Sequence, residues 1–337
     1  MSRLIQPPLR NRTARHRPSL LLSVLAVTLS AVVLSSAATA QTGAAFLDLG
    51  IGGRAMGMGG ALSTHASGAE AIHYNPAGLA GEQGRTVQVG YQSLSLDRTH
   101  ATLAGAMNLR GGLAFGLAWT HASAGPIDAR TGSGELVAGG IDDTEQAIGF
   151  ALGSRVNEKV LLGASLKVLS HNIDVDVHGS GESSASGRAI DIGAIIVEVI
   201  PQWRVAVGAR NLLGKLSWDV RRGSAQSSAS EDDLPMTPYV GVGGTWRRVR
   251  IGAEAQLYDV RGVSQARLHA GAEADLSPML SVRGGLHRVG DADGLGLLAM
   301  GISIRPMHSN RLAFHYAWVA DDLSAGGRSV LSIGGVF

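Results

Sequence analysis

Residues 311–319 read Arg-Leu-Ala-Phe-His-Tyr-Ala-Trp-Val, and their side chains alternate in character. One face of this stretch, if extended, carries Leu312, Phe314, Tyr316 and Trp318. Small or polar residues, including His315, fall on the other face, because successive side chains of a β-strand point to opposite sides. The same alternation is present at 112–120, 160–168 and 266–275. This two-residue period predicts β-strands.

The chemistry of the two faces indicates where these strands lie. In a soluble β-sandwich the polar face would point to water, whereas in a transmembrane barrel the apolar face contacts lipid and the polar face lines the lumen. After Ala40 the sequence has no stretch of 18 apolar residues. Because a chain in lipid must satisfy its own backbone as helices or as a closed barrel, we predict an all-β fold, a transmembrane antiparallel β-barrel. A soluble periplasmic β-protein is the alternative.

About fourteen alternating segments can be counted, and together they assign residues 85–337 to the barrel. They start near Arg85, Thr99, Gly112, Thr144, Lys159, Gly187, Trp203, Thr237, Val249, Ser264, Met279, Gly294, Arg311 and Gly327. The connections after the even-numbered segments are short, at 110–111, 155–158, 200–202, 247–248, 276–278 and 306–310. Long loops are expected at the other end, at 125–143, 175–186 and 213–236. Outer-membrane barrels have short periplasmic turns and longer extracellular loops, so this asymmetry orients the barrel.

Both ends of the chain indicate export to the bacterial outer membrane. Residues 1–18 carry five arginines and no acid, an apolar run of about 15 residues follows, and Ala38-Thr39-Ala40 has the small residues of a cleavage site. We therefore predict a signal peptide over residues 1–40, cleaved after Ala40; an uncleaved membrane anchor is the alternative. At the other end, the aromatic Phe337 closes the last alternating segment. We predict that it is the signal by which the barrel-assembly machinery inserts the barrel into the lipid bilayer.

Composition narrows the possible partners and cofactors. Of 29 basic and 27 acidic residues, five basic ones belong to the predicted signal, so the mature chain carries 24 against 27, a net charge of −3. Nucleic acid is therefore not an implied partner. The absence of cysteine excludes a lipid-anchored lipoprotein, disulfides and thiolate metal sites. The 11 histidines are scattered and the glycine run at 57–60 follows no strand, so we predict neither a metal site nor a cofactor.

The segment between the signal and the first strand, residues 41–84, does not alternate and is rich in Gly, Ala and Met. Residues 54–61 read Arg-Ala-Met-Gly-Met-Gly-Gly-Ala, and residues 74–80 read Tyr-Asn-Pro-Ala-Gly-Leu-Ala. These two runs resemble the N-terminal segment of the PorV/PorQ family of outer-membrane proteins, within the FadL-like superfamily. The resemblance implies a barrel of fourteen strands whose N-terminal segment folds inward as a hatch. The hatch residues that it marks are Arg54, Gly57, Gly59, Asn75, Pro76 and Ala77; a simple tight turn is the alternative.

The resemblance implies two functions. FadL-like proteins bind hydrophobic small molecules, such as fatty acids, or transport them across the outer membrane. PorV-type proteins are accessory or shuttle proteins in protein secretion, with secretion-system components as partners. A minor third hypothesis, an outer-membrane lipase, comes from His121 and Ser123, which share a strand face so that the imidazole could activate the hydroxyl. No acid can be assigned to orient His121, so we predict that the protein is not an enzyme.

Ionisable side chains of both signs fall on the inward faces of the predicted strands. They are Lys167, Asp191, Arg204, Arg210, Glu254, Arg267, His269, Glu273, Arg283, His287 and His315. One interpretation is a hydrated lumen of mutually paired charges that anchors the hatch. The other is a cationic patch that binds the carboxylate of a ligand. On the second interpretation the ligand candidates are Lys167, Arg204, Arg210, Arg267, His269 and Arg283.

Overall fold

The computed structural model describes residues 43–81, 84–131, 133–175, 181–222, 225–260, 263–290, 296–306, 311–321 and 324–337. The predicted signal peptide, residues 1–40, and its cleavage site lie outside the described residues. Within the described part of the chain, no helix has the length and apolar character needed to cross a bilayer.

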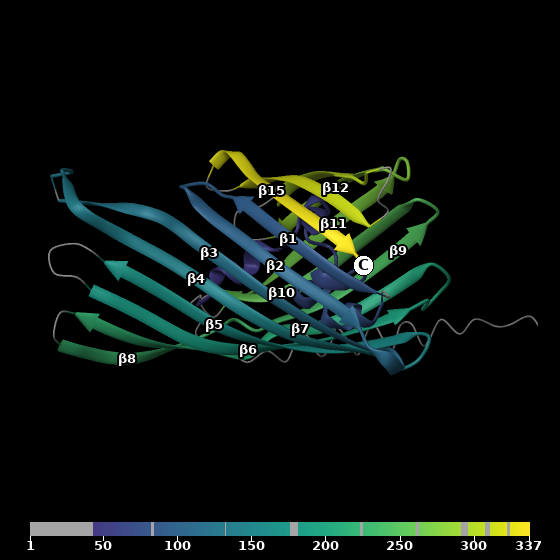
Figure 1. The fold of residues 1–337 in the computed structure, drawn as a ribbon, viewed down its shortest axis with the longest axis horizontal. Helices are drawn as coiled ribbons and strands as arrows, with labels where there is room; N and C mark the ends of the chain where they lie inside the picture. Colours follow the sequence, from purple (N-terminus) through teal and green to yellow (C-terminus); the bar gives the residue numbers. More distant parts are fainter. Residues whose placement is uncertain are drawn as a thin grey trace, which may run out of the picture. The chain divides into compact units, whose positions relative to one another are not determined.

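A single antiparallel sheet closes on itself as a barrel (Figure 1). Its strands are β1 (Arg85–Ser93), β2 (Arg98–Asn108), β3 (Leu113–Arg130), β4 (Leu136–Arg155), β5 (Val160–Val175), β6 (Gly181–Val197), β7 (Trp203–Arg222), β8 (Ala225–Asp233), β9 (Thr237–Trp246), β10 (Val249–Val260), β11 (Val263–Asp275), β12 (Leu280–Val289), β13 (Leu297–Ile304), β14 (Leu312–Asp321) and β15 (Ser324–Val336). Closure comes from the pairing of β1 with β15 and of β6 with β7. Because β8 pairs with β7 alone in the described sheet, the closed barrel has 14 strands, which confirms the predicted fold.

The apolar face of the strands points out of the barrel, as the alternation predicted. In β3, Leu113 and Leu117 are exposed, whereas Ala114 and Ala118, each the next residue along the strand, are buried. The same division is seen in β14, where Phe314 is exposed on the outer side. In lipid these outer side chains contact acyl chains, and the inner faces enclose the lumen.

The two ends of the barrel differ, although not in the way expected. Of the connections predicted to be short, those at 110–111, 155–158, 200–202, 247–248 and 276–278 are short, and the first contains a 3₁₀ turn, η4 (Arg110–Gly112). The last, at 306–310, lies mostly outside the described residues. The long loops predicted at 125–143, 175–186 and 213–236 are wrong, because most of their described residues extend the strands. Pairing of β3 with β4 continues, for example, through Ile127 opposite Ile141. Gly, Ser and Asp suggested loops there, but such residues are tolerated in a hairpin whose faces both meet water.

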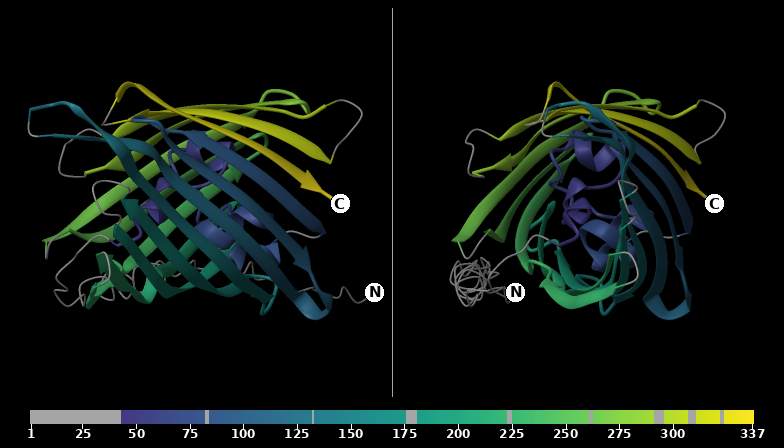
Figure 2. Two further views of the ribbon diagram at one scale, coloured as in Figure 1. Left: turned by 60° about the vertical axis from the view of Figure 1, so that its left-hand side comes forward. Right: turned by 90° about the vertical axis from the view of Figure 1, so that its left-hand side faces the viewer.

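Residues 43–81 form a hatch enclosed by the strands (Figure 2). It consists of short helices: η1 (Ala45–Leu49), α2 (Gly53–Gly57), η2 (Gly68–Glu70), α3 (Ala71–Tyr74) and η3 (Pro76–Gly81). Apolar clusters join it to the wall: Ile72 and Leu79 pack in a cluster with Ala114, and Phe46 packs in one with Leu216. Burial against the wall stabilises these helices, because helices this short do not form alone in water.

Candidate functional site

The Asn75-Pro76-Ala77 turn docks one side of the hatch against the wall. Asn75 is fully buried and extended, as expected for a residue before proline. Its Oδ1 accepts a hydrogen bond from the Ala77 amide at 3.1 Å. Its Nδ2 donates to the carbonyl oxygens of Ser63 at 3.2 Å and Ala194 at 3.3 Å. Because Ala194 lies in β6, this one side chain connects the turn, the rest of the hatch and the barrel.

The segment in and after α2 docks the opposite side. The carbonyl oxygen of Gly59 accepts hydrogen bonds from Nδ1 of His269 at 2.8 Å and of His287 at 3.0 Å. Gly57 lies so close to β13 that a Cβ added to it would be 3.1 Å from the Cα atom of Gly301. Glycine therefore lets the hatch backbone reach the wall at this point.

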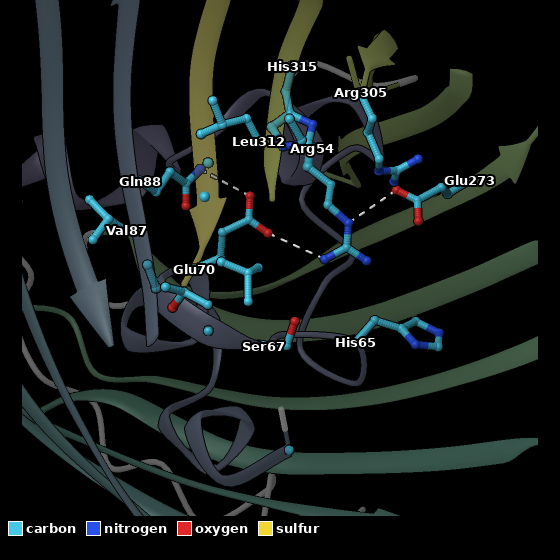
Figure 3. A pocket seen from close by; sticks show the side chains of 18 of the residues that line it. Arg54, His65, Ser67, Glu70, Val87, Gln88, Glu273, Arg305, Leu312 and His315 are labelled. Carbon is cyan, nitrogen blue, oxygen red and sulfur yellow. Dashed lines mark hydrogen bonds and ion pairs between the residues drawn. The ribbon is translucent and has the colours of Figure 1, made fainter. Parts of the chain in front are cut away.

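Arg54 connects the hatch to the wall through charge. Its Nη1 lies 3.5 Å from Oε2 of Glu70 in the hatch, and its Nε lies 3.1 Å from Oε2 of Glu273 in β11 (Figure 3). Arg250 and Arg283 also form ion pairs with Glu273. One buried carboxylate thus meets three guanidinium groups, and since a buried charge is costly without partners, this network holds α2 against the barrel.

Burial controls the titration of the hatch side chains. It raises the pKa of Glu70, although the positive charge of Arg54 acts in the opposite direction. It lowers the pKa of His65 to about 4 and the pKa of His73 well below its usual value. It also raises the pKa of the Tyr74 hydroxyl. Both imidazoles are therefore neutral at neutral pH, because an apolar environment disfavours their charged form.

The predicted ligand candidates lie on inward faces, and most have a carboxylate of their own. The pairs are Lys167 with Asp191 at 2.9 Å, Arg210 with Glu254 at 3.0 Å, Arg267 with Asp48 at 3.4 Å and Arg283 with Glu273 at 2.5 Å. His269 holds the hatch, and His315 contacts the Ser303 hydroxyl. This arrangement is the one expected of a paired lumen that anchors the hatch. A ligand-binding role for these residues stays a prediction.

Phe337 lies at the closing seam of the barrel. Its amide donates to the Arg85 carbonyl at 2.8 Å, and the Arg85 amide donates to its carbonyl at 3.2 Å. The ring is exposed on the outer surface next to Gly335. The position is compatible with an insertion signal, and that role stays a prediction.

Two cavities lie at opposite ends of the hatch. The larger, of about 500 Å³, is at the end with the short connections, where Arg54 and Glu70 face wall residues such as Gln88 and His315 (Figure 3). The smaller, of about 190 Å³, is at the other end of the hatch. Its apolar lining comes mainly from Phe46, Leu49 and Leu94, with Ala45, Ala122 and Ala124. The first is therefore polar and cationic. The second combines this apolar surface with the polar side chains of Arg98, Thr99, Ser123, Asp143 and Glu145.

The residues of the lipase hypothesis are not arranged for catalysis. The Ser123 hydroxyl donates to the Ala124 carbonyl at 3.4 Å. Nδ1 of His121 is buried without a hydrogen-bond partner among the described residues, and its ring stacks on Trp119. A nucleophilic serine needs a hydrogen bond to its base and a group that orients the base.

In the part of the chain that the structure describes, no group of three or more His, Asp or Glu residues is placed to hold a metal ion.

The sequence interpretation missed the glycines of the wall. A Cβ added to Gly163 would overlap the backbone of Pro76, and one added to Gly271 or Gly285 would overlap the backbone around Met58. These glycines occupy inward positions of their strands, on the same faces as the ionisable residues singled out above. Their position on the inward face of the strands was the signal that could have identified them as contact points for the hatch.

The barrel with its inward hatch has a fold that is also found in solved structures of hydrocarbon channels and of a FadL homologue. The monoaromatic hydrocarbon channel CymD matches with a TM-score of 0.62 and 14% identity, over 86% of this chain and 98% of that one. The toluene transporter TodX of Pseudomonas putida matches with a TM-score of 0.64 and 11% identity, over 86% and 99%. A FadL homologue of Pseudomonas aeruginosa matches with 0.61 and 11%, over 85% and 98%. No protein-family model and no curated protein sequence matches the chain.

Proposed function

We propose that this protein is an outer-membrane channel that binds small hydrophobic compounds and passes them across the membrane beside the hatch. The observation that carries the proposal is the apolar side of the smaller cavity, formed by Phe46, Leu49 and Leu94 at the outer end of the hatch. It lies inside a barrel with the fold of channels described as carrying monoaromatic hydrocarbons and toluene. A cavity of about 190 Å³ suits a compound of that size.

The test is a substitution whose larger side chain fills this cavity. Leu94 is buried and lines it, so Leu94→Trp is expected to reduce uptake of labelled toluene several-fold in cells or proteoliposomes. Leu136→Trp is the matched control, because Leu136 is exposed in the β3–β4 hairpin. Equal amounts of folded protein in the membrane are verified before uptake is compared. Uptake by Leu94→Trp equal to that of the parent protein would contradict the proposal.

The secretion role is the second candidate, and the hatch sequence supports it. The runs at 54–61 and 74–80, which resemble the PorV/PorQ family, include the Arg54 and Asn75 contacts that dock the hatch. On this hypothesis the protein is an accessory or shuttle protein that meets secretion-system components. A deletion strain would then accumulate exported proteins in the periplasm while toluene uptake stays unchanged, which is the reverse of the result expected for a channel.

The boundaries of the chain belong to the same proposal. Residues 1–40 are the cleaved signal peptide, residues 41–84 are the hatch and residues 85–337 are the barrel. The burial of the described hatch residues supports the second boundary, since β1 begins at Arg85. The intact mass of the purified protein tests the first boundary, because a mature chain begins at Gln41.

A further inference from the structure

The larger cavity has features that a channel for neutral hydrocarbons does not need. Its lining includes five arginines, namely Arg54, Arg204, Arg250, Arg305 and Arg311. Among the residues that the structure describes, the carboxylates in the lining are Glu70 and Glu273. Among these described residues, cationic side chains outnumber anionic ones around a volume of about 500 Å³, which lies within the usual size range of small-molecule sites.

The carboxylates nearby are already shared. Glu273 pairs with Arg54 and Arg250, and also with Arg283 behind them. Arg305 lies 3.7 Å from Asp275, which in turn pairs with Arg250 at 3.0 Å. A carboxylate that serves several guanidinium groups does not neutralise them all. The cavity therefore retains positive charge that an anion would offset.

Arg204 is the residue that a ligand would meet. It is half-buried at the start of β7 and lines the cavity. In contrast to the other lumen arginines, it has no hydrogen bond or ion pair with any other residue that the structure describes. Guanidinium groups bind carboxylate and phosphate through two parallel hydrogen bonds. A half-buried guanidinium without such a partner marks a place for an oxyanion.

The remainder of the lining selects among oxyanions. Leu312, Ala313 and Val336 line the cavity at the closing seam, and Ala69 adds an apolar surface from the hatch. Free inorganic phosphate would leave this surface unused. A carboxylate attached to a compact apolar body would place its charge at the arginines and cover the apolar side.

The surrounding rim adds long-range attraction. Exposed basic residues at this end are Arg85, Arg110, Arg155, Lys159, Arg247, Arg248 and Arg311, and the exposed acids among the described residues of the same turns are Glu158 and Glu198. A surplus of one sign around a concave site raises the local concentration of ions of the opposite sign.

We propose that this cavity is a binding site for a small organic carboxylate, with Arg204 as its principal ligand and Arg54 and Arg250 beside it. The site lies at the periplasmic end of the hatch, apart from the smaller cavity at its outer end. It stands whether or not neutral hydrocarbons pass through the barrel.

The test measures binding to the mature protein in mild detergent by calorimetry. The probes are benzoate and hexanoate, their neutral amides benzamide and hexanamide, and inorganic phosphate. At least one carboxylate is expected to bind about tenfold more tightly than its amide, with an affinity that falls as salt rises. Equal affinity for acid and amide, no carboxylate binding, or tighter binding of phosphate than of both carboxylates would overturn the proposal.

Variants locate the site. Arg204→Gln is expected to weaken carboxylate binding about tenfold, and Arg204→Lys less, because lysine keeps the charge but not the two parallel hydrogen bonds. Arg130→Gln is the control, since Arg130 is exposed at the other end of the barrel and pairs with Asp128. Faster migration of unboiled protein on a gel establishes that each variant is folded. Unchanged binding by folded Arg204→Gln would place the ligand elsewhere, and toluene uptake by the same variant separates this result from the channel proposal.

Discussion

Single glycines decide how closely the hatch approaches the wall. In β12, Gly285 faces the backbone of Met58, whereas the neighbouring Gly284 has no atom within 4 Å of the position a Cβ would take. Adjacent residues of one strand point to opposite sides. The same amino acid thus has a packing role at one position and none at the next.

This contrast gives the first prediction. Gly285→Ala places a methyl group into the hatch backbone, and overpacking of this kind costs about 1–3 kcal/mol. We expect the hatch to shift, and limited proteolysis to cleave residues 43–81 faster than in the parent protein. Gly284→Ala is expected to leave the cleavage rate unchanged. Identical protection of the two variants would show that the hatch does not rest on Gly285.

Some residue roles could be predicted from the sequence, and others could not. The resemblance marked Asn75 and Gly59, and both make direct hatch-to-wall hydrogen bonds. The parity of each strand placed Arg204 on the inward face. Its lack of a partner depends on which strands become neighbours, and no local pattern carries that information.

At the scale of elements, the position of α2 depends more on its ion pairs with the wall than on the stability of the helix itself. It has five residues and no side-chain cap, so its position depends on Arg54 and the buried Glu273. Removing a carboxylate that pairs with three guanidinium groups strongly destabilises the folded protein, because the buried guanidinium charges are then left without a partner.

The second prediction follows from this network. Glu273→Gln is expected to lower the free energy of unfolding by about 3–5 kcal/mol, the usual cost of breaking a buried ion pair. The measurement is the fraction of protein that migrates as the folded band on a gel at increasing urea concentration. Glu231→Gln is the control, because Glu231 pairs with Lys215 where both side chains are exposed, and exposed pairs contribute about 0–1 kcal/mol. Equal midpoints for the two variants would show that Glu273 does not stabilise the docked hatch.

The sequence predicted where strands begin better than where they end. Alternation located the start of most strands, but β4 begins at Leu136 rather than Thr144, β6 begins at Gly181 rather than Gly187, and β8 was not predicted. The end of β3 also lies well past the expected limit. The bend in β7 was also missed: Asn211 and Leu213 have positive φ, and beyond them β7 leaves β9 and pairs with β8. Such features depend on long-range pairing, which the local period of side chains does not encode.

At the scale of the whole molecule, closure of the sheet is what allows it to exist in lipid. An open edge would expose unpaired backbone groups, and in a bilayer no water is available to satisfy them. The seam between β1 and β15 removes that edge through eight residue pairs, from Thr86 with Val336 to Ser93 with Ser329.

The third prediction concerns this closure. The parent protein is expected to migrate faster on a denaturing gel when unboiled than when boiled, because the closed barrel resists detergent. Deletion of residues 324–337 removes β15 and leaves one edge of β1 and one edge of β14 without a partner strand, so the fast band is expected to disappear. A fast band that persists after the deletion would contradict a barrel sealed by its last strand.

The seam has a consequence for biogenesis. The ribosome makes β1 long before β15, yet the two must be neighbours in the finished protein. The barrel therefore cannot close until β15 has been made and has paired with β1. A chain cut short before residue 324 lacks β15, so it keeps two free sheet edges that the full sheet does not have.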